Sequence, residues 1–138
     1  MIEIIAGLKG HGKTKLLIQK VNDDIKLTKG TIVYLDKNNK HMYELSNQIR
    51  LIVVPDFNIE NTDMFIGFIA GILSQDHDLD KVYLDSFMTT ACVDGNLDYA
   101  ISKLNVLSER YDVDFVISAS IDKDDLSEEV QKYISVAV

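Results

Sequence analysis

The chain has 138 residues, the size of one domain, and its 46% hydrophobic and 26% charged residues exclude a disordered chain. Its 22 acidic residues against 14 lysines and arginines give a formal net charge of -8, which argues against a protein that binds nucleic acid along a basic face. The single cysteine, Cys92, can form no internal disulfide and no cysteine-rich zinc site. Without a signal-peptide pattern or an apolar run long enough to cross a bilayer, the sequence predicts one cytoplasmic domain over residues 1–138 with no membrane contact.

Strand and helix patterns alternate along the chain. Continuous hydrophobic runs predict strands, and hydrophobic residues at helical spacing predict helices. In chain order we expect a strand at 2–6, a helix at 13–27, a strand at 31–36, a short helix at 41–48, a strand at 50–54, a helix at 64–73, a strand at 81–85, a loop, a helix at 97–111, a strand at 114–120, a helix at 124–132 and a strand at 134–138. Because continuous runs suit strands buried on both faces, the pattern predicts an α/β fold, a three-layer α/β/α sandwich with a mostly parallel sheet of five to six strands.

One motif carries the chemistry. Residues 7–14 read Gly-Leu-Lys-Gly-His-Gly-Lys-Thr and match the G-x-x-x-x-G-K-[ST] pattern of a phosphate-binding loop. Glycines let the backbone wrap so that its N–H groups point at phosphate oxygens, next to the positive end of the following helix. Lys13 is expected to reach the β- and γ-phosphates, and the Thr14 hydroxyl to bind Mg²⁺. We expect the nucleotide to contact Gly7, Lys9, Gly10, His11, Gly12, Lys13, Thr14 and Lys15.

On these residues, which lie between a buried-type strand and an amphipathic helix, the sequence resembles the P-loop NTPase superfamily. The alternation of strands and helices extends the resemblance over the whole chain. A second segment fits it, because in residues 82–85, Val-Tyr-Leu-Asp, an apolar strand ends in a carboxylate as a Walker B motif does. The resemblance implies that the chain binds ATP and that Asp85 holds the Mg²⁺ shell through water.

Two branches of the superfamily fit the residues poorly. GTPases need Asp-x-x-Gly at the Walker B strand, where Asp85 is followed by Ser-Phe-Met, and an Asn-Lys-x-Asp motif, where this chain has Asp122 in place of the asparagine. Nucleoside and nucleotide kinases usually carry several lid arginines, whereas this chain has only Arg50 and Arg110. The sequence therefore resembles the RecA-like, additional-strand branch, which favours ATP over GTP.

In that branch a polar residue ends the strand that lies between the P-loop strand and the Walker B strand. The resemblance implies this role for Ser118 or Ser120, and we take Ser120 as the catalytic candidate; small polar residues are equally ordinary at a strand end. The glutamate that often follows the Walker B aspartate is replaced here by Ser86. Some RecA-like and secretion-type members instead place an acid at the end of the second strand, which points to Asp36 as the base. Aspartate is shorter than glutamate, so the chain is better suited to binding ATP than to hydrolysing it.

The N-terminal stretch is also similar to short bacterial P-loop proteins described as PilT-like twitching-motility ATPases, over their core only, which does not support a motor function. We therefore expect an ATP-binding protein and Mg²⁺-dependent ATPase with Lys13, Asp36 and Ser120 in catalytic roles. Two alternatives stay open: a nucleotide-dependent switch or adaptor with little or no hydrolysis, and a degenerate P-loop interaction module. A protein partner or a homo-oligomer is compatible with each, and the apolar helix at 64–73 offers a face for self-association.

Overall fold

The computed structural model describes all 138 residues. Its strands are β1 (Ile2–Gly7), β2 (Thr31–Asp36), β3 (Arg50–Val53), β4 (Leu79–Leu84), β5 (Asp114–Ser120) and β6 (Ile134–Ala137). Its helices are α1 (Lys13–Asp24), α2 (Thr62–Gln75), α3 (Phe87–Thr90), α4 (Leu97–Tyr111) and α5 (Glu128–Gln131), with short 3-10 helices at Met42–Glu44, Val54–Phe57 and Lys123–Asp125. Strands and helices alternate along the chain as the hydrophobic pattern predicts.

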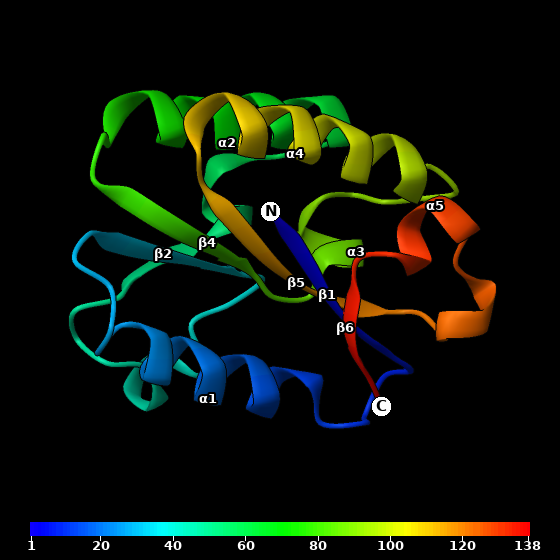
Figure 1. Cartoon of the computed structure of the whole chain (residues 1–138), viewed down its shortest axis with the longest axis horizontal. Helices are drawn as coiled ribbons and strands as arrows, with labels where there is room; N and C mark the ends of the chain where they lie inside the picture. The colour runs from blue at the N-terminus through cyan, green and yellow to red at the C-terminus, as the bar shows by residue number, and fades with distance from the viewer.

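All six strands form one parallel sheet in the order β3-β2-β4-β5-β1-β6. Helix α1 covers one face of the sheet, and α2 and α4 cover the other (Figure 1). Each interface is filled by buried hydrophobic side chains, with Leu17 and Val21 of α1 on one side and Phe65 of α2 and Leu104 of α4 on the other. The predicted three-layer α/β fold is confirmed, and the sheet is parallel throughout.

The strand order places β5 between β1 and β4, although β5 follows both in the chain. It pairs in register with β1, from Ile2 opposite Phe115 to Gly7 opposite Ser120, and on its other side with β4. Because the strands are parallel, the carboxyl ends of β1, β4 and β5 meet at one edge of the sheet, where ligands of open α/β folds bind. The inserted strand is the feature that the additional-strand branch requires.

Several expected elements differ from the structure. Helix α1 ends at Asp24, because the residues after it form turns around the exposed Leu27. The helix expected at 41–48 is a single short 3-10 helix, since no residue of Met42–Glu44 is buried and no apolar face anchors more turns. The helix expected at 124–132 is broken, and α5 begins only where the Ser127 hydroxyl accepts a hydrogen bond from a later backbone amide. The loop expected after β4 contains α3, which buries Phe87 in the core.

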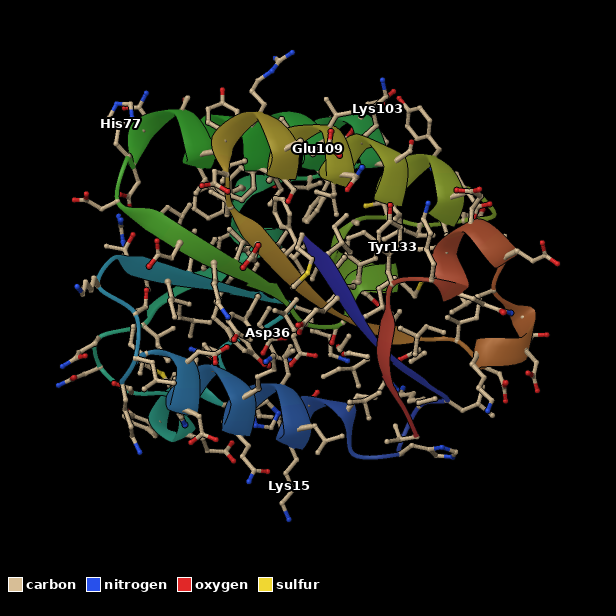
Figure 2. The ribbon with its side chains drawn as sticks, viewed as in Figure 1. Lys15, Asp36, His77, Lys103, Glu109 and Tyr133 are labelled. Carbon is tan, nitrogen blue, oxygen red and sulfur yellow. The ribbon has the colours of Figure 1, made fainter.

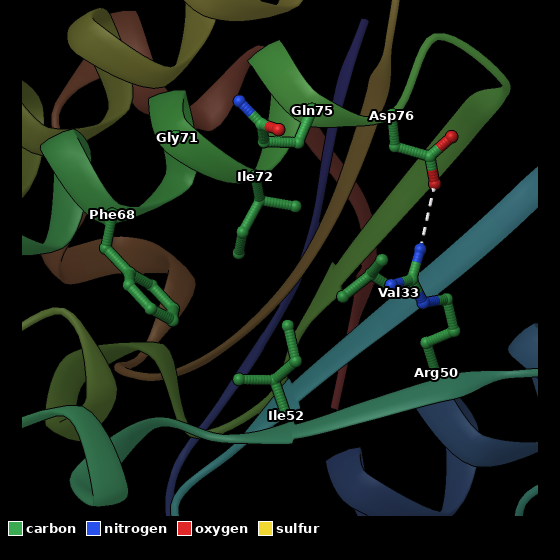
Figure 3. Close-up of a pocket in the computed structure, with 8 residues that line it drawn as sticks. All are labelled: Val33, Arg50, Ile52, Phe68, Gly71, Ile72, Gln75 and Asp76. Carbon is green, nitrogen blue, oxygen red and sulfur yellow. Dashed lines mark hydrogen bonds and ion pairs between the residues drawn. The ribbon is translucent and has the colours of Figure 1, made fainter.

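Helix α2 leaves part of its apolar surface open beside the edge of the sheet. A groove of about 410 Å³ lies between α2 and the strands β2 and β3 (Figure 3). Phe68 and Ile72 of α2 face Ile52 of β3 across it, and an ion pair of 3.1 Å between Arg50 and Asp76 lies at its end. None of the helices combines the length and hydrophobicity that crossing a membrane would require.

Candidate nucleotide site

The register of the sheet brings three polar residues together at its carboxyl edge. Leu35 pairs with Leu84, and Leu84 pairs with Ile117. The residues that directly follow these three therefore stand in one row across β2, β4 and β5; they are Asp36, Asp85 and Ser118. Side chains alternate between the faces of a sheet, and residues two positions earlier pack in the cluster under α1. The row therefore lies on the α1 face, the side on which the phosphate loop leads into its helix.

The phosphate loop connects β1 to α1, and its backbone explains two of its glycines. Gly10 and Gly12 have φ angles of 87° and 82°, in the left-handed region that glycine adopts without strain. A Cβ atom at either position would meet no atom within 4 Å, so the backbone conformation and not a lack of space requires glycine there. Gly7 differs, because a Cβ atom would lie 2.5 Å from the carbonyl oxygen of Val138. Backbone angles thus require glycine at 10 and 12, and lack of space requires it at 7.

Lys13 lies at the start of α1 with its side chain folded into the loop. Its residue surface is only 6% exposed, and Nζ donates a hydrogen bond of 2.9 Å to the carbonyl oxygen of Leu8. Burial lowers the pKa of Lys13 below its usual value, and the negative charge of Asp85 acts in the opposite direction. The ammonium group is therefore held inside the loop by one neutral acceptor, which a phosphate could replace.

Asp85 is the centre of the hydrogen bonds at the edge of the sheet. Its Oδ1 atom accepts from Thr14 Oγ1 at 3.1 Å, from Ser118 Oγ at 2.8 Å and from the Ser86 amide at 2.8 Å. Its Oδ2 atom accepts from the Tyr34 hydroxyl at 2.7 Å, and the residue is 1% exposed. The bond from Thr14 joins the phosphate loop directly to the end of β4.

Ser86, the residue after Asp85, carries a backbone feature that fixes this arrangement. Its φ angle of 50° lies in the left-handed region, which is uncommon for a residue with a side chain. Its amide donates both to Asp85 Oδ1 and to Ser118 Oγ, the latter at 3.1 Å. The sharp turn thus directs the chain from β4 into α3 while its amide stays bonded at the carboxylate.

Asp36 lies at the end of β2, and the structure places it between the sheet and α1 (Figure 2). One carboxyl oxygen accepts a 2.7 Å hydrogen bond from the Lys37 amide, and no donor of the chain bonds to the other oxygen, which stays in reach of solvent. Burial and the neighbouring negative charge of Asp85 raise the pKa of Asp36 above its usual value. Asp36 therefore has a free acceptor atom and an increased affinity for a proton.

A polar pocket of about 350 Å³ lies between the phosphate loop and the carboxyl ends of the strands. It has no hydrophobic lining and is formed by Lys9, Gly10, Gly12, Lys13, Thr14, Lys37, Asp85, Ser86, Ser118 and Ser120. Of the residues expected to bind nucleotide or act in catalysis, Gly7, His11, Lys15 and Asp36 are not part of this lining. The Lys15 side chain is exposed and projects away from the sheet in Figure 2.

Three residues of the site were not predicted. Lys37 and Ser86 line the pocket, and the Tyr34 hydroxyl holds Asp85 from below. The position of Lys37, directly after a strand that ends in an acid, does indicate a contact with a base or a partner, since that edge binds ligands, but we favoured an ordinary polar loop over 37–41. Nothing in the sequence distinguishes Tyr34 from an ordinary core residue of β2.

Neither arginine of the chain lies at the pocket. Arg50 begins β3, and Arg110 lies in the last turn of α4, just before β5 begins. Both positions belong to the amino ends of the parallel strands, at the edge of the sheet opposite the phosphate loop. The cations that line the pocket are therefore all lysines.

No protein-family model matches the chain, and no curated protein matches its sequence. Among solved structures, it is similar to the flagellar accessory protein FlaH from Methanocaldococcus jannaschii, with a TM-score of 0.60 over 95% of this chain and 13% sequence identity. The fold resembles the RecA-like NTPase fold of FlaH. The chain spans 65% of the FlaH chain, and at this identity the likeness concerns the fold alone. In this fold β1 leads into the loop at residues 7–14, Asp85 directly follows β4, and β5 lies between β1 and β4.

Proposed function

We propose that the chain binds ATP together with Mg²⁺ in the polar pocket at the carboxyl ends of β1, β4 and β5. The observation that carries this proposal is the 3.1 Å hydrogen bond from Thr14 Oγ1 to Asp85 Oδ1, because these two residue types hold Mg²⁺ in proteins with such a loop. Hydroxyl and carboxylate oxygens are the hard ligands that Mg²⁺ prefers. A lining without hydrophobic side chains also suits a triphosphate.

Different groups of the loop bind different parts of the nucleotide and its metal ion in this proposal. Backbone amides of the loop and of the first turn of α1 point at phosphate oxygens, aided by the positive end of the helix. Lys13 exchanges its bond with the Leu8 carbonyl for the β- and γ-phosphates. Bound Mg²⁺ would offset the negative charge of these phosphates, held by Thr14 directly and by Asp85 through water.

We further propose that this site hydrolyses ATP slowly, with Asp36 as the acceptor for the proton of the attacking water. Its free carboxyl oxygen and raised pKa support this role, since a base is most useful when its pKa approaches the working pH. Asp36 does not itself line the pocket, so a water has to reach it from the phosphate, which is consistent with slow turnover. Ser120 lines the pocket, which supports a contact with the γ-phosphate.

The location of the arginines favours a second candidate function, a nucleotide-dependent switch or adaptor. Arginine stabilises the charge of the transferred phosphate in many such enzymes, and here Arg50 and Arg110 lie at the wrong edge of the sheet. A protein partner or a second copy of the chain would then supply the missing cation. FlaH is described as an accessory protein, and the shared fold supports a protein partner for this chain as well.

The experiment that tests the proposal measures thermal unfolding and phosphate release on the same sample. At a MgATP concentration of about 100 times Kd, binding is expected to stabilise the wild type by about 2.7 kcal/mol and Lys13→Ala not at all. Phosphate release that is lost in Lys13→Ala and in Asp36→Asn would support the ATPase. Stabilisation without release would support the switch, and no stabilisation of the wild type would contradict both and leave the interaction module.

A further inference from the structure

Two tyrosines stack on the face of the sheet that α1 covers. Tyr34 of β2 and Tyr83 of β4 stand opposite each other in register, with ring centroids 6.2 Å apart and planes inclined by 11°. Neither residue is exposed to solvent. Each tyrosine is therefore the stacking partner of the other, and both are fully buried on the same face of the sheet.

Their hydroxyl groups bond to carboxylates of different regions. The Tyr34 hydroxyl donates to Asp85 Oδ2 at 2.7 Å, at the carboxyl edge of the sheet. The Tyr83 hydroxyl donates to Asp24 at the end of α1, which also forms ion pairs with Lys20 at 3.7 Å and Lys81 at 3.3 Å. Only one member of the stacked pair thus contacts the nucleotide site.

The bond from Tyr34 holds one oxygen of Asp85 away from the pocket. A carboxylate can rotate about the bond that joins it to Cβ, and its two oxygens are otherwise equivalent. Because Oδ2 accepts a hydrogen bond from the buried Tyr34 hydroxyl, Oδ1 is the oxygen at the pocket. Oδ1 accepts hydrogen bonds from Thr14, Ser118 and the Ser86 amide. A hydrogen bond from a neutral donor to a charged carboxylate is among the stronger ones in proteins.

We propose that Tyr34 is a positioning residue for magnesium, which orients Asp85 so that one oxygen is presented to the Mg²⁺ shell of the bound nucleotide. This inference rests on the proposed binding of MgATP. Groups that bond to the residues around a metal commonly change metal affinity or activity by 10- to 100-fold when they are removed. Tyr34 acts through Asp85 and touches neither the nucleotide nor the metal.

The test compares Tyr34→Phe with Tyr83→Phe, because each variant removes one hydroxyl from the same stacked pair. Binding of ATP is measured by titration calorimetry, first with EDTA and then as a function of Mg²⁺ concentration at fixed ATP. Tyr34→Phe is expected to raise the Mg²⁺ concentration for half-maximal binding by about tenfold. Its affinity for ATP in EDTA is expected to stay within about twofold of the wild type, and Tyr83→Phe is expected to change neither quantity.

Equal Mg²⁺ dependence in the two variants would overturn the inference while leaving MgATP binding intact. Absence of MgATP binding by the wild type would overturn the proposed function and this inference together. Tyr34→Phe leaves a buried charged oxygen without its donor, so it is also made in the Asp85→Asn background, where that charge is gone. There Tyr34→Phe is expected to add no further shift in Mg²⁺ dependence, and an additional shift would contradict the inference.

Discussion

Asp36 and Asp85 occupy neighbouring positions at the ends of two paired strands, with the Asp85 amide donating a 2.9 Å hydrogen bond to the carbonyl oxygen of the residue before Asp36. Their carboxyl groups differ in their partners. Asp85 accepts four hydrogen bonds from the chain, whereas Asp36 accepts one, from the Lys37 amide. Four donors thus stabilise the charge of Asp85, and burial together with this charge raises the pKa of Asp36, which agrees with the proposed roles of the two residues.

Asp36→Asn is expected to increase stability at neutral pH and to abolish hydrolysis while MgATP binding remains. The pKa of Asp36 is raised from 3.8 in the folded protein, so the folded state binds this proton more tightly than the unfolded state does. The wild type therefore loses stability as pH rises from 3.8 through the raised pKa, and the variant does not.

Melting temperatures of the wild type and Asp36→Asn at several pH values check this. The advantage of the variant should be largest at pH 7 and shrink toward acid pH. The prediction would be contradicted by a variant that is less stable than the wild type at pH 7, or by a gain in melting temperature that does not depend on pH. Either result would show that the folded structure does not raise the pKa of Asp36.

Ser118 and Ser120 lie on the same strand and are expected to differ in what they do. Ser118 is buried and donates to Asp85 Oδ1 at 2.8 Å, so Ser118→Ala should lower the free energy of unfolding by about 1–2 kcal/mol. Ser120 is exposed at the pocket, so Ser120→Ala should leave stability within about 0.5 kcal/mol and reduce phosphate release. Urea unfolding and phosphate release of the two variants separate these roles; equal effects on stability would contradict the assignment.

Lys37 is expected to favour ATP over ADP. It lines the pocket from the end of β2, across from the phosphate loop, and so on the side where the terminal phosphate would lie. Lys37→Gln should weaken ATP binding by about 10- to 100-fold and ADP binding much less, because a charge-assisted hydrogen bond contributes about 1.5–3 kcal/mol and 1.4 kcal/mol is about tenfold in affinity. Lys40→Gln removes an exposed lysine of the same loop and serves as the control. Equal losses for ATP and ADP would place Lys37 away from the terminal phosphate.

The strands and the phosphate loop could be predicted because a short stretch of sequence indicates each of them. All six strands are hydrophobic runs in one sheet, mostly buried in β1, β2, β4 and β5 and more exposed in the edge strands β3 and β6. The loop depends on glycines such as Gly10 and Gly12 that take left-handed backbone angles. The strand order could not be derived from periodicity, since the place of β5 between β1 and β4 is set by pairing over long distances. It was expected only from the resemblance to RecA-like proteins.

The remaining differences have local physical causes. The helix expected at 41–48 does not form, because the aromatic side chain of Tyr43 is 92% exposed and gives the segment no buried face. Helix α3 was missed because it has four residues and begins after the left-handed Ser86, which no propensity indicates. Tyr34 could not be assigned a role, since only the register between β2 and β4 brings its hydroxyl to Asp85.

The most direct test of the account is a calorimetric titration of the wild type with MgATP, alongside Lys13→Ala and Lys15→Ala. Lys13 folds into the loop, whereas the Lys15 side chain points away from the sheet, so the two variants remove the same charge from different places. The account predicts saturable binding to the wild type and to Lys15→Ala, and none to Lys13→Ala. Absence of binding to all three proteins, or equal binding to all three, would contradict it.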